Sequence, residues 1–303
     1  MDRRSFLAAL ATVTAGCGAR SGGGSDAGAP TATPVDVPAD SPDTAGAIAV
    51  GESGIDPETA SPENVDLFHR LESEPDATFL APSRESFSGG SSEGWMYVRN
   101  RGDVTVTVDV GWRLLKYSGH RWVPIRAPQI GRNGASILAP GERWRRPHAI
   151  ERVFGLPVLG PGLYARVERV RPESGDPRSV GALFRVSDTE FRIEARREPV
   201  ERGEDVVVVE LGGRARRELV LERIESADEG IELVPEAVGA IPMFRDSLPH
   251  LRTARTVRVA TSSAEVAFQY LEWATAGGRA VEPGDPLDIG ATSFEARIEE
   301  RNR

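Results

Sequence analysis

Residues 104–114 read VTVTVDVGWRL, and this stretch decides the fold class of the chain. Its apolar side chains recur at every second position, at Val104, Val106, Val108, Val110, Trp112 and Leu114. Side chains of a β-strand point alternately to opposite faces, so this period of two predicts a half-buried strand. We expect the apolar face of that strand to lie against a core.

Short strand-like runs surround this stretch, near residues 95–98, 122–125, 137–139, 163–167 and 183–186, and turn residues separate them. About seven short strands with frequent Gly and Pro turns favour an all-β sandwich, which we place at residues 76–192. Tyr164 follows Pro161-Gly162, which suits a tyrosine corner, where the hydroxyl ties a loop to the sheet. The predicted core includes Val106, Val108, Trp112, Trp122 and Tyr164.

Four sequence blocks carry a resemblance to a known family: VRN at 98–100, LKYSGHRWVP at 115–124, LAPGE at 138–142 and LGPGLYAR at 159–166. Residues 95–186 thereby resemble the bacterial immunoglobulin-like domains of cell-surface and lipid-anchored proteins. The chain departs from the family after Tyr164, where Ala165 stands in place of the usual basic residue. The resemblance implies an immunoglobulin-like β-sandwich, and it leaves the ligand open because such domains host many functions.

Residues 198–303 predict a smaller α+β domain of unknown family. The β-branched run 206–209 indicates a buried strand, and residues 219–224 could pair with it across Gly212-Gly213. Further strands are expected at 257–259 and 294–298, and an amphipathic helix at 266–274. Ser262 and Glu265 have capping-box spacing before that helix, and Gly277-Gly278 would end it. Residues 235–252 also have helical spacing, which Pro242 and Pro249 would break or kink.

The first 17 residues have the layout of an export signal. Arg3-Arg4 precede a short apolar stretch, and Ala15-Gly16-Cys17 follows it. The arginine pair resembles a twin-arginine signal, and the ending resembles a lipobox, in which a diacylglycerol joins the cysteine sulfur. Thr14 stands where many bacterial lipoboxes carry Leu. Cys17 is the only cysteine, so no disulfide can form within the chain, and we expect Cys17 to carry a lipid.

The net charge of −9 is unevenly distributed. Residues 21–68 hold nine acids and neither Lys nor Arg, whereas residues 69–303 sum to −2. Residues 18–75 have few large apolar groups, and they predict a disordered acidic tether. Lys116 is the only lysine. Acid-rich, lysine-poor chains resemble proteins of halophilic archaea, although an arginine-biased genome explains the lysine deficit equally well.

The candidate chemical residues are few. Four histidines, His69, His120, His148 and His250, are far apart and have no paired-ligand spacing, so neither a metal site nor a cofactor is expected. Arg143, Arg145 and Arg146 flank Trp144 on a predicted strand. This cluster is either a partner-contact surface or a solvated edge strand with one buried Trp. The acidic balance without a basic stripe argues against nucleic-acid binding.

These observations favour a lipid-anchored surface protein on the extracytoplasmic face of a membrane, acting as a binding or structural module and not as an enzyme. Its partners would be the membrane, through the lipid, and an unidentified surface or envelope component. The alternative is an extracellular hydrolase or metal-dependent enzyme with an unrecognised site in residues 198–303. A deep pocket lined by converging His, Asp and Glu would favour that alternative.

Overall fold

The computed structural model describes residue 55 and residues 62–73, 75–88, 95–109, 111–118, 120–125, 135–147, 159–212, 215–225, 229–276 and 278–301. The chain is mainly β, as the sequence predicts. Residues Gly46–Arg303 form one compact unit. No helix in the described ranges is long and apolar enough to cross a membrane.

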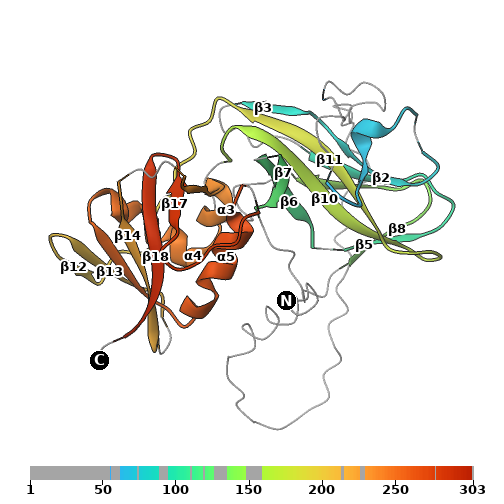
Figure 1. Cartoon of the computed structure of the whole chain (residues 1–303). Coiled ribbons are helices and arrows are strands. Elements are labelled where there is room, and N and C mark those ends of the chain that lie inside the picture. The colour runs from blue at the N-terminus through green and yellow to red at the C-terminus, as the bar shows by residue number, and fades with distance from the viewer. Residues whose placement is uncertain are drawn as a thin grey trace, which may run out of the picture. The chain divides into compact units, whose positions relative to one another are not determined.

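An eight-stranded sheet dominates the first half of this unit. Its strands are β1 (Asp66–Leu67), β3 (Ser86–Ser88), β5 (Val106–Asp109), β6 (Arg113–Ser118), β7 (Arg121–Pro124), β8 (Ala135–Leu138), β10 (Gly162–Pro172) and β11 (Arg178–Ser187). β10 and β11 form a long antiparallel hairpin (Figure 1). β5 and β6 both pair with β10 along its other edge.

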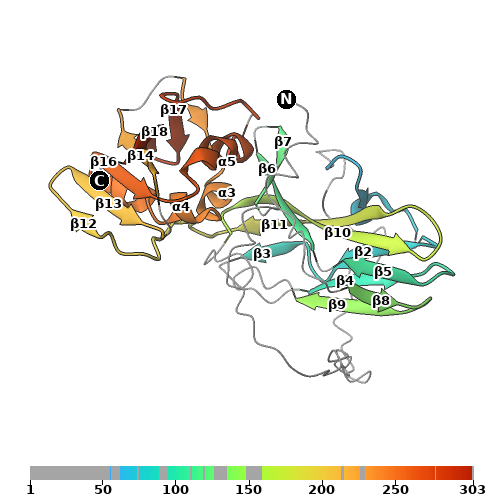
Figure 2. The same cartoon turned by 90° about the horizontal axis from the view of Figure 1, so that it is seen from below.

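A smaller antiparallel sheet contains β2 (Thr78–Pro82), β4 (Trp95–Asn100) and β9 (Arg143–Pro147). It lies beside β5 and β8 of the larger sheet (Figure 2). Phe79, Leu80 and Met96 of this sheet are buried in the same core as Val106 and Val108. The first half is therefore built from two sheets around one apolar core.

The predicted strand at 104–114 is interrupted. Val108 pairs with Val170 of β10, and Arg113 pairs with Val167, so the segment between them is two residues longer than the stretch of β10 that it spans. Such an insertion bends a strand and breaks its ladder. Because the excess is two residues, side-chain alternation is preserved, and Trp112 reaches the same core as Val108.

The predicted core is confirmed except at one position. Val106, Val108, Trp112 and Tyr164 are all buried. Trp122 is half-buried and packs instead on a separate apolar cluster that includes Leu115, Leu163 and Leu183, with its ring 5.4 Å from that of Tyr117. The prediction for Trp122 was wrong because the β6–β7 hairpin pairs Tyr117 with Trp122 outside the main core.

The predicted C-terminal boundary of the tether, residue 75, was wrong, because β1 and η1 lie before it. Asp66 and Leu67 pair in parallel with β11, and Phe68 begins a short 3-10 helix, η1 (Phe68–Arg70). Leu67 and Phe68 are 2% and 1% exposed. This apolar pair supplies the burial that the acidic residues before it lack, so the folded unit includes residues that the charge pattern assigned to the tether.

The second half contains a seven-stranded sheet. In spatial order its strands are β12 (Glu201–Arg202), β13 (Val206–Glu210), β16 (Thr256–Ala260), β14 (Arg217–Arg223), β18 (Thr292–Glu300), β17 (Pro286–Ile289) and β15 (Ile231–Glu232). The helices α3 (Pro235–Gly239), α4 (Pro242–Arg245) and α5 (Ala267–Ala274) cover one face (Figures 1 and 2). Two short 3-10 helices, η2 (Leu248–Arg252) and η3 (Ala264–Val266), complete this layer.

Strand pairing in this half differs from the sequence expectation. β14 does not pair with β13, because β16 lies between them, parallel to β13 and antiparallel to β14. The run 206–209 is also not buried on both faces: Val207 and Val209 face the core, but Val206 is 40% exposed. Helices cover only one face of the sheet, which explains this alternation.

The prolines divide the predicted helical stretch into separate short helices. Pro235, Pro242 and Pro249 each stand in the first two residues of α3, α4 and η2, where a missing backbone N–H costs nothing. The capping box at Ser262 does not form, because Ser263 is the N-cap of η3 and makes no side-chain cap. The Thr261 hydroxyl instead accepts a hydrogen bond from the Ser263 N–H at 3.2 Å.

The uncovered face of the sheet carries alternating arginines and glutamates. Arg258 bonds to Glu218 and lies 2.7 Å from Glu299, and Arg297 lies 2.9 Å from Glu222. The carboxylate of Glu218 is buried, whereas the pairs of Arg258 with Glu299 and of Arg297 with Glu222 are partly exposed, and pairs of the latter kind each contribute about 0–1 kcal/mol. Their main effect is to make this face of the sheet hydrophilic, so that it can remain in contact with water without a covering layer.

Candidate functional site

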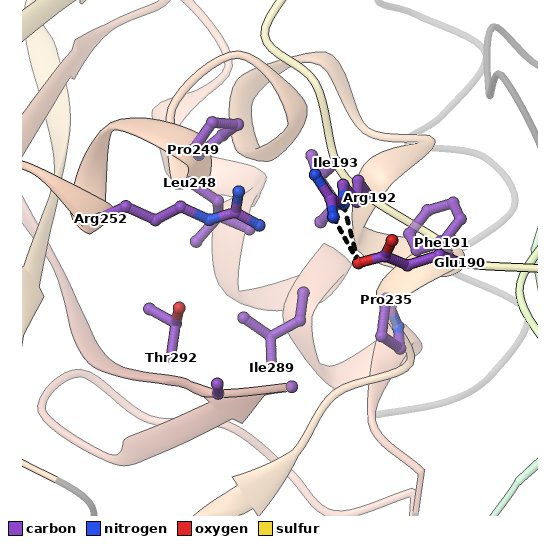
Figure 3. A pocket seen from close by; sticks show the side chains of 12 residues that line it. Glu190, Phe191, Arg192, Ile193, Pro235, Leu248, Pro249, Arg252, Ile289 and Thr292 are labelled. Atoms are coloured by element: carbon purple, nitrogen blue, oxygen red, sulfur yellow. Dashed lines mark hydrogen bonds and ion pairs between the residues drawn. The ribbon is translucent and has the colours of Figure 1, made fainter.

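A pocket of about 500 Å³ lies in the second half of the unit (Figure 3). Three segments line it: residues 190–193 of the connection after β11, the helical residues Pro235, Leu248, Pro249 and Arg252, and residues 289–292 between β17 and β18. We call it the linker pocket. Ligand sites of proteins have volumes of about 300–1,000 Å³ and are mostly apolar, so this pocket has a suitable size.

The connection after β11 forms one wall of the pocket, and its side chains alternate between the core and the solvent. Phe191 and Ile193 are half-buried and pack on the core, whereas Glu190 and Arg192 point outward and form an ion pair at 2.7 Å. The side chains of this pair are 73% and 60% exposed, so the pair adds little stability. It does neutralise both charges at that wall.

Hydrogen bonds fix the connection on both sides of the pocket. Before it, the Thr189 hydroxyl donates to the Leu159 carbonyl oxygen at 2.8 Å. After it, the Arg196 backbone N–H donates to Asp246 Oδ1 at 2.9 Å. Burial alone would raise the pKa of Asp246, but hydrogen bonds from Arg245 and Arg196, with the charges of Arg245 and Arg197, lower it overall. The pocket wall is therefore held in place without a ligand.

The β17–β18 turn forms the opposite wall. Ile289 pairs with Thr292, which leaves Gly290 and Ala291 as a two-residue turn. Gly290 has φ +59°, the left-handed conformation that the first central position of a type II′ turn requires. This turn brings the Ile289 and Thr292 side chains to the pocket (Figure 3).

Arg252 supplies the unpaired charge of the pocket. It ends η2, and its guanidinium points into the pocket (Figure 3). Within the described part of the chain, Arg252 forms no ion pair, whereas Arg192 beside it is paired with Glu190. The lining therefore combines apolar walls with one available cation.

A buried polar cluster adjoins the pocket, and Glu236 is its centre. Glu236, which follows the lining residue Pro235, is 1% exposed. Its Oε1 lies 2.6 Å from Lys116 Nζ and 3.0 Å from the Gly160 N–H nitrogen. The Tyr164 hydroxyl lies 2.9 Å from the same Oε1 and 2.7 Å from the Gly160 carbonyl oxygen, and these two acceptors share its proton. We call this group the Glu236 cluster.

The Glu236 cluster joins the two halves of the compact unit. Lys116, Gly160 and Tyr164 belong to the first half and Glu236 to the second. Burial, with the negative charge of Glu236, raises the pKa of Tyr164 far above its ordinary value, so Tyr164 remains neutral. A side chain at Gly160 would clash with the Glu236 carboxylate and come within 3.0 Å of Phe191 Cβ. The predicted tyrosine corner is confirmed through the bond from Tyr164 to Gly160.

The predicted partner-contact residues lie on β9, which pairs with β4. Trp144 is half-buried against the core, while Arg143 and Arg145 are exposed, with the Arg143 guanidinium 5.9 Å from the Tyr97 ring centre. Arg146 continues the strand opposite Met96. Of these residues, Arg143 and Arg145 are exposed on the outer face of β9, whereas Trp144 contributes to packing.

The histidines do not converge. His69 is buried, accepts the Leu183 N–H on Nδ1 at 3.2 Å, and has Nε2 3.1 Å from Glu85 Oε1. Burial lowers its pKa, although Glu85 acts in the opposite direction. His120 is exposed at φ +65° in the β6–β7 turn, and His250 lies in η2. No group of three or more His, Cys, Asp or Glu in the described ranges is placed to hold a metal ion.

Other predicted site residues lie outside the described part of the chain. Arg3, Arg4 and Cys17 fall there, as does His148. The lipid attachment and the export signal thus remain predictions from the sequence.

The comparisons with known proteins add little. No family model and no curated protein matches the chain. One similar solved structure is a crystal structure of a Bordetella pertussis protein that carries the name ApaA, at 18% identity. The match covers 37% of this chain and 94% of that one, with a TM-score of 0.24, and a likeness at that level supports no conclusion about fold or function.

Proposed function

We propose that this chain is a lipid-anchored protein of the extracytoplasmic membrane face that acts as a binding module, with the linker pocket as its ligand site. The observation that carries the binding role is the pocket itself. It offers about 500 Å³ between apolar walls, together with one cation, Arg252. Its walls are fixed by hydrogen bonds from Thr189 and to Asp246, so binding would not need to order them.

The composition of the pocket favours binding over the hydrolase alternative. Its described lining contains one acid, Glu190, which is paired with Arg192, and no histidine or cysteine. A general acid–base pair needs two titratable groups within reach of one substrate. The lining of the linker pocket offers an apolar surface instead.

The anchor and the location rest on the N-terminal residues. Arg3-Arg4 and Ala15-Gly16-Cys17 support export followed by lipid attachment, and the acidic residues 21–68 support a spacer between the membrane and the folded unit. The lysine-poor, acid-rich composition is in keeping with a high-salt environment. The immunoglobulin-like assignment of residues 76–192 belongs to this proposal as well, supported by the four sequence blocks and by the tyrosine corner at Tyr164.

The anchor is tested by replacing Cys17 with Ser and fractionating the cells. We expect the variant to leave the membrane fraction while the parent chain remains in it. Replacing Arg3 and Arg4 together with Lys is the matched test of export, and it should retain unprocessed protein inside the cell. A Cys17→Ser chain that sediments with membranes as the parent does would contradict the lipid anchor.

A further inference from the structure

Charge in the linker pocket is unevenly compensated. Arg192 and Glu190 lie 2.7 Å apart and cancel each other. Arg252 has no acidic partner among the residues that the structure describes, so the lining carries one uncompensated positive charge. This occurs in a chain whose net charge is −9. A neutral or cationic ligand would leave that guanidinium without a partner.

Two polar side chains, Arg252 and Thr292, lie on the side of the pocket opposite the Glu190–Arg192 pair. Figure 3 shows the Arg252 guanidinium pointing into the pocket, with the Thr292 side chain on the same side. A guanidinium presents its N–H donors as a planar fork that matches a carboxylate, and a threonine hydroxyl can add a third donor. One carboxylate of a ligand could accept hydrogen bonds from both Arg252 and Thr292.

Apart from the Glu190–Arg192 pair, the rest of the lining is apolar. Phe191, Ile193 and Ile289 are half-buried, and the buried Leu248 also lines the pocket. Their remaining exposure is apolar area that a ligand could cover, and covering such area stabilises a complex. The pocket thus combines an anion-binding end with an apolar body.

We propose that the linker pocket binds a small amphipathic monoanion, a carboxylate attached to an apolar body, with the carboxylate on Arg252 and Thr292. This inference rests on the binding role proposed above and specifies its ligand class. The single uncompensated charge selects a monoanion over a phosphate dianion. The pocket volume limits the apolar body to a short chain or a ring.

Octanoate is a suitable probe, with 1-octanol and octylammonium as matched neutral and cationic controls. The full chain carrying Cys17→Ser, which no lipid can modify, would be labelled at isoleucine methyl groups. Resonances of Ile193 and Ile289 then report occupancy of this pocket. Octanoate can make a charge-assisted hydrogen bond to Arg252 that neutral 1-octanol cannot. We therefore expect octanoate to bind about tenfold or more tightly than 1-octanol at constant ionic strength.

Two substitutions separate the charge from the apolar walls. Arg252→Gln should abolish the preference for octanoate while leaving 1-octanol binding unchanged. Arg255→Gln removes the same charge from an exposed arginine outside the lining and should change neither affinity. Ile289→Ala should weaken octanoate and 1-octanol by a similar factor, because both place an alkyl chain against it.

The outcomes distinguish the ligand class from the binding role. Equal affinity for octanoate and 1-octanol, or a preference for octanoate that survives Arg252→Gln, would overturn the carboxylate proposal and leave the pocket as a binding site. Tighter binding of octyl phosphate than of octanoate would overturn the monoanion class. If no probe shifts the Ile193 and Ile289 resonances, both the ligand class and the proposed ligand site fail.

Discussion

Replacing Glu236 should destabilise the folded unit more than any nearby surface substitution. Glu236 is 1% exposed, and its Oε1 accepts from Lys116 at 2.6 Å and from the Gly160 N–H at 3.0 Å. Removing one partner of a buried ion pair costs about 3–5 kcal/mol. Lys116 keeps 14% of its side chain exposed and can turn partly to water, so we expect Glu236→Ala to cost about 3 kcal/mol, the lower end of that range.

Glu236→Gln isolates the contribution of charge. Its amide oxygen can accept the same hydrogen bonds, and its NH₂ group takes the place of Oε2, which has no hydrogen-bond partner in the described structure. We expect a smaller loss, about 1–2 kcal/mol, typical of a charged hydrogen bond made neutral. Glu232→Gln, an exposed neighbouring acid, is the matched control and should change stability by less than about 0.5 kcal/mol.

Urea unfolding of the single variants and of the double variant measures the coupling. Lys116→Met should also be strongly destabilising, because it leaves a buried carboxylate without its cation. The double variant Glu236→Gln with Lys116→Met should lose less than the sum of the two single losses, by about 1 kcal/mol or more. Additive losses, or a Glu236→Ala variant as stable as the parent, would refute the view that this cluster holds the two halves together.

Two further perturbations test the first half. Burial lowers the pKa of His69 below 6.5 in the folded state, so the unfolded chain binds the proton more readily. The stability that neutral His69 contributes is therefore fully present above about pH 6.5, and it is lost as the pH falls below that value. His69→Gln should flatten the pH dependence of urea unfolding between pH 7.5 and 5.5, whereas the exposed His120→Gln should not; equal slopes would contradict this. Trp112→Ala should cost about 3–5 kcal/mol, because the ring is 8% exposed and lies 4.2 Å from the buried Arg166 guanidinium; a variant that melts like the parent would be inconsistent with that burial.

Patterns in the sequence correctly predicted the elements that are determined by residues close together in the chain. The alternation at 294–298 corresponds to β18, and the helical face at 266–274 corresponds to α5. Tyr164 was placed correctly because its hydroxyl bonds to Gly160, four residues away, and the Pro161-Gly162 turn between them is visible in the sequence. Each of these features is determined over a few residues.

Pairing between distant strands could not be predicted in this way. β16 enters the sheet between β13 and β14 only after the chain has passed through α3, α4 and η2. The runs in β13 and β14 both contain consecutive apolar residues and are separated by glycines, so nothing local distinguishes a hairpin from two strands with a third between them. The two extra residues between Val108 and Arg113 were hidden for a related reason, because an even insertion leaves the alternation intact.

The candidate site was missed because its residues carry no local signal. Arg252 is one of 36 arginines, and Glu236 follows a proline in a stretch that reads as an ordinary helix start. Lys116 was the exception. A single lysine in a chain that otherwise uses arginine is a compositional outlier, and the structure places it on the buried carboxylate of Glu236. Its partner Glu236 lies 120 positions away, and no local pattern in the sequence links the two residues.

The linker pocket and the Glu236 cluster share part of their structure. Pro235 lines the pocket and Glu236 is the next residue, while Phe191 lies against Gly160, whose N–H donates to Glu236. Loosening the cluster would therefore move two walls of the pocket, so weaker octanoate binding in Glu236→Ala would not by itself count against the ligand class. The hydrogen bonds of the cluster do not involve Arg252, so we expect Arg252→Gln to change ligand selectivity without changing urea unfolding. Selectivity and stability that shifted together in Arg252→Gln would mean that this guanidinium supports the fold rather than a ligand.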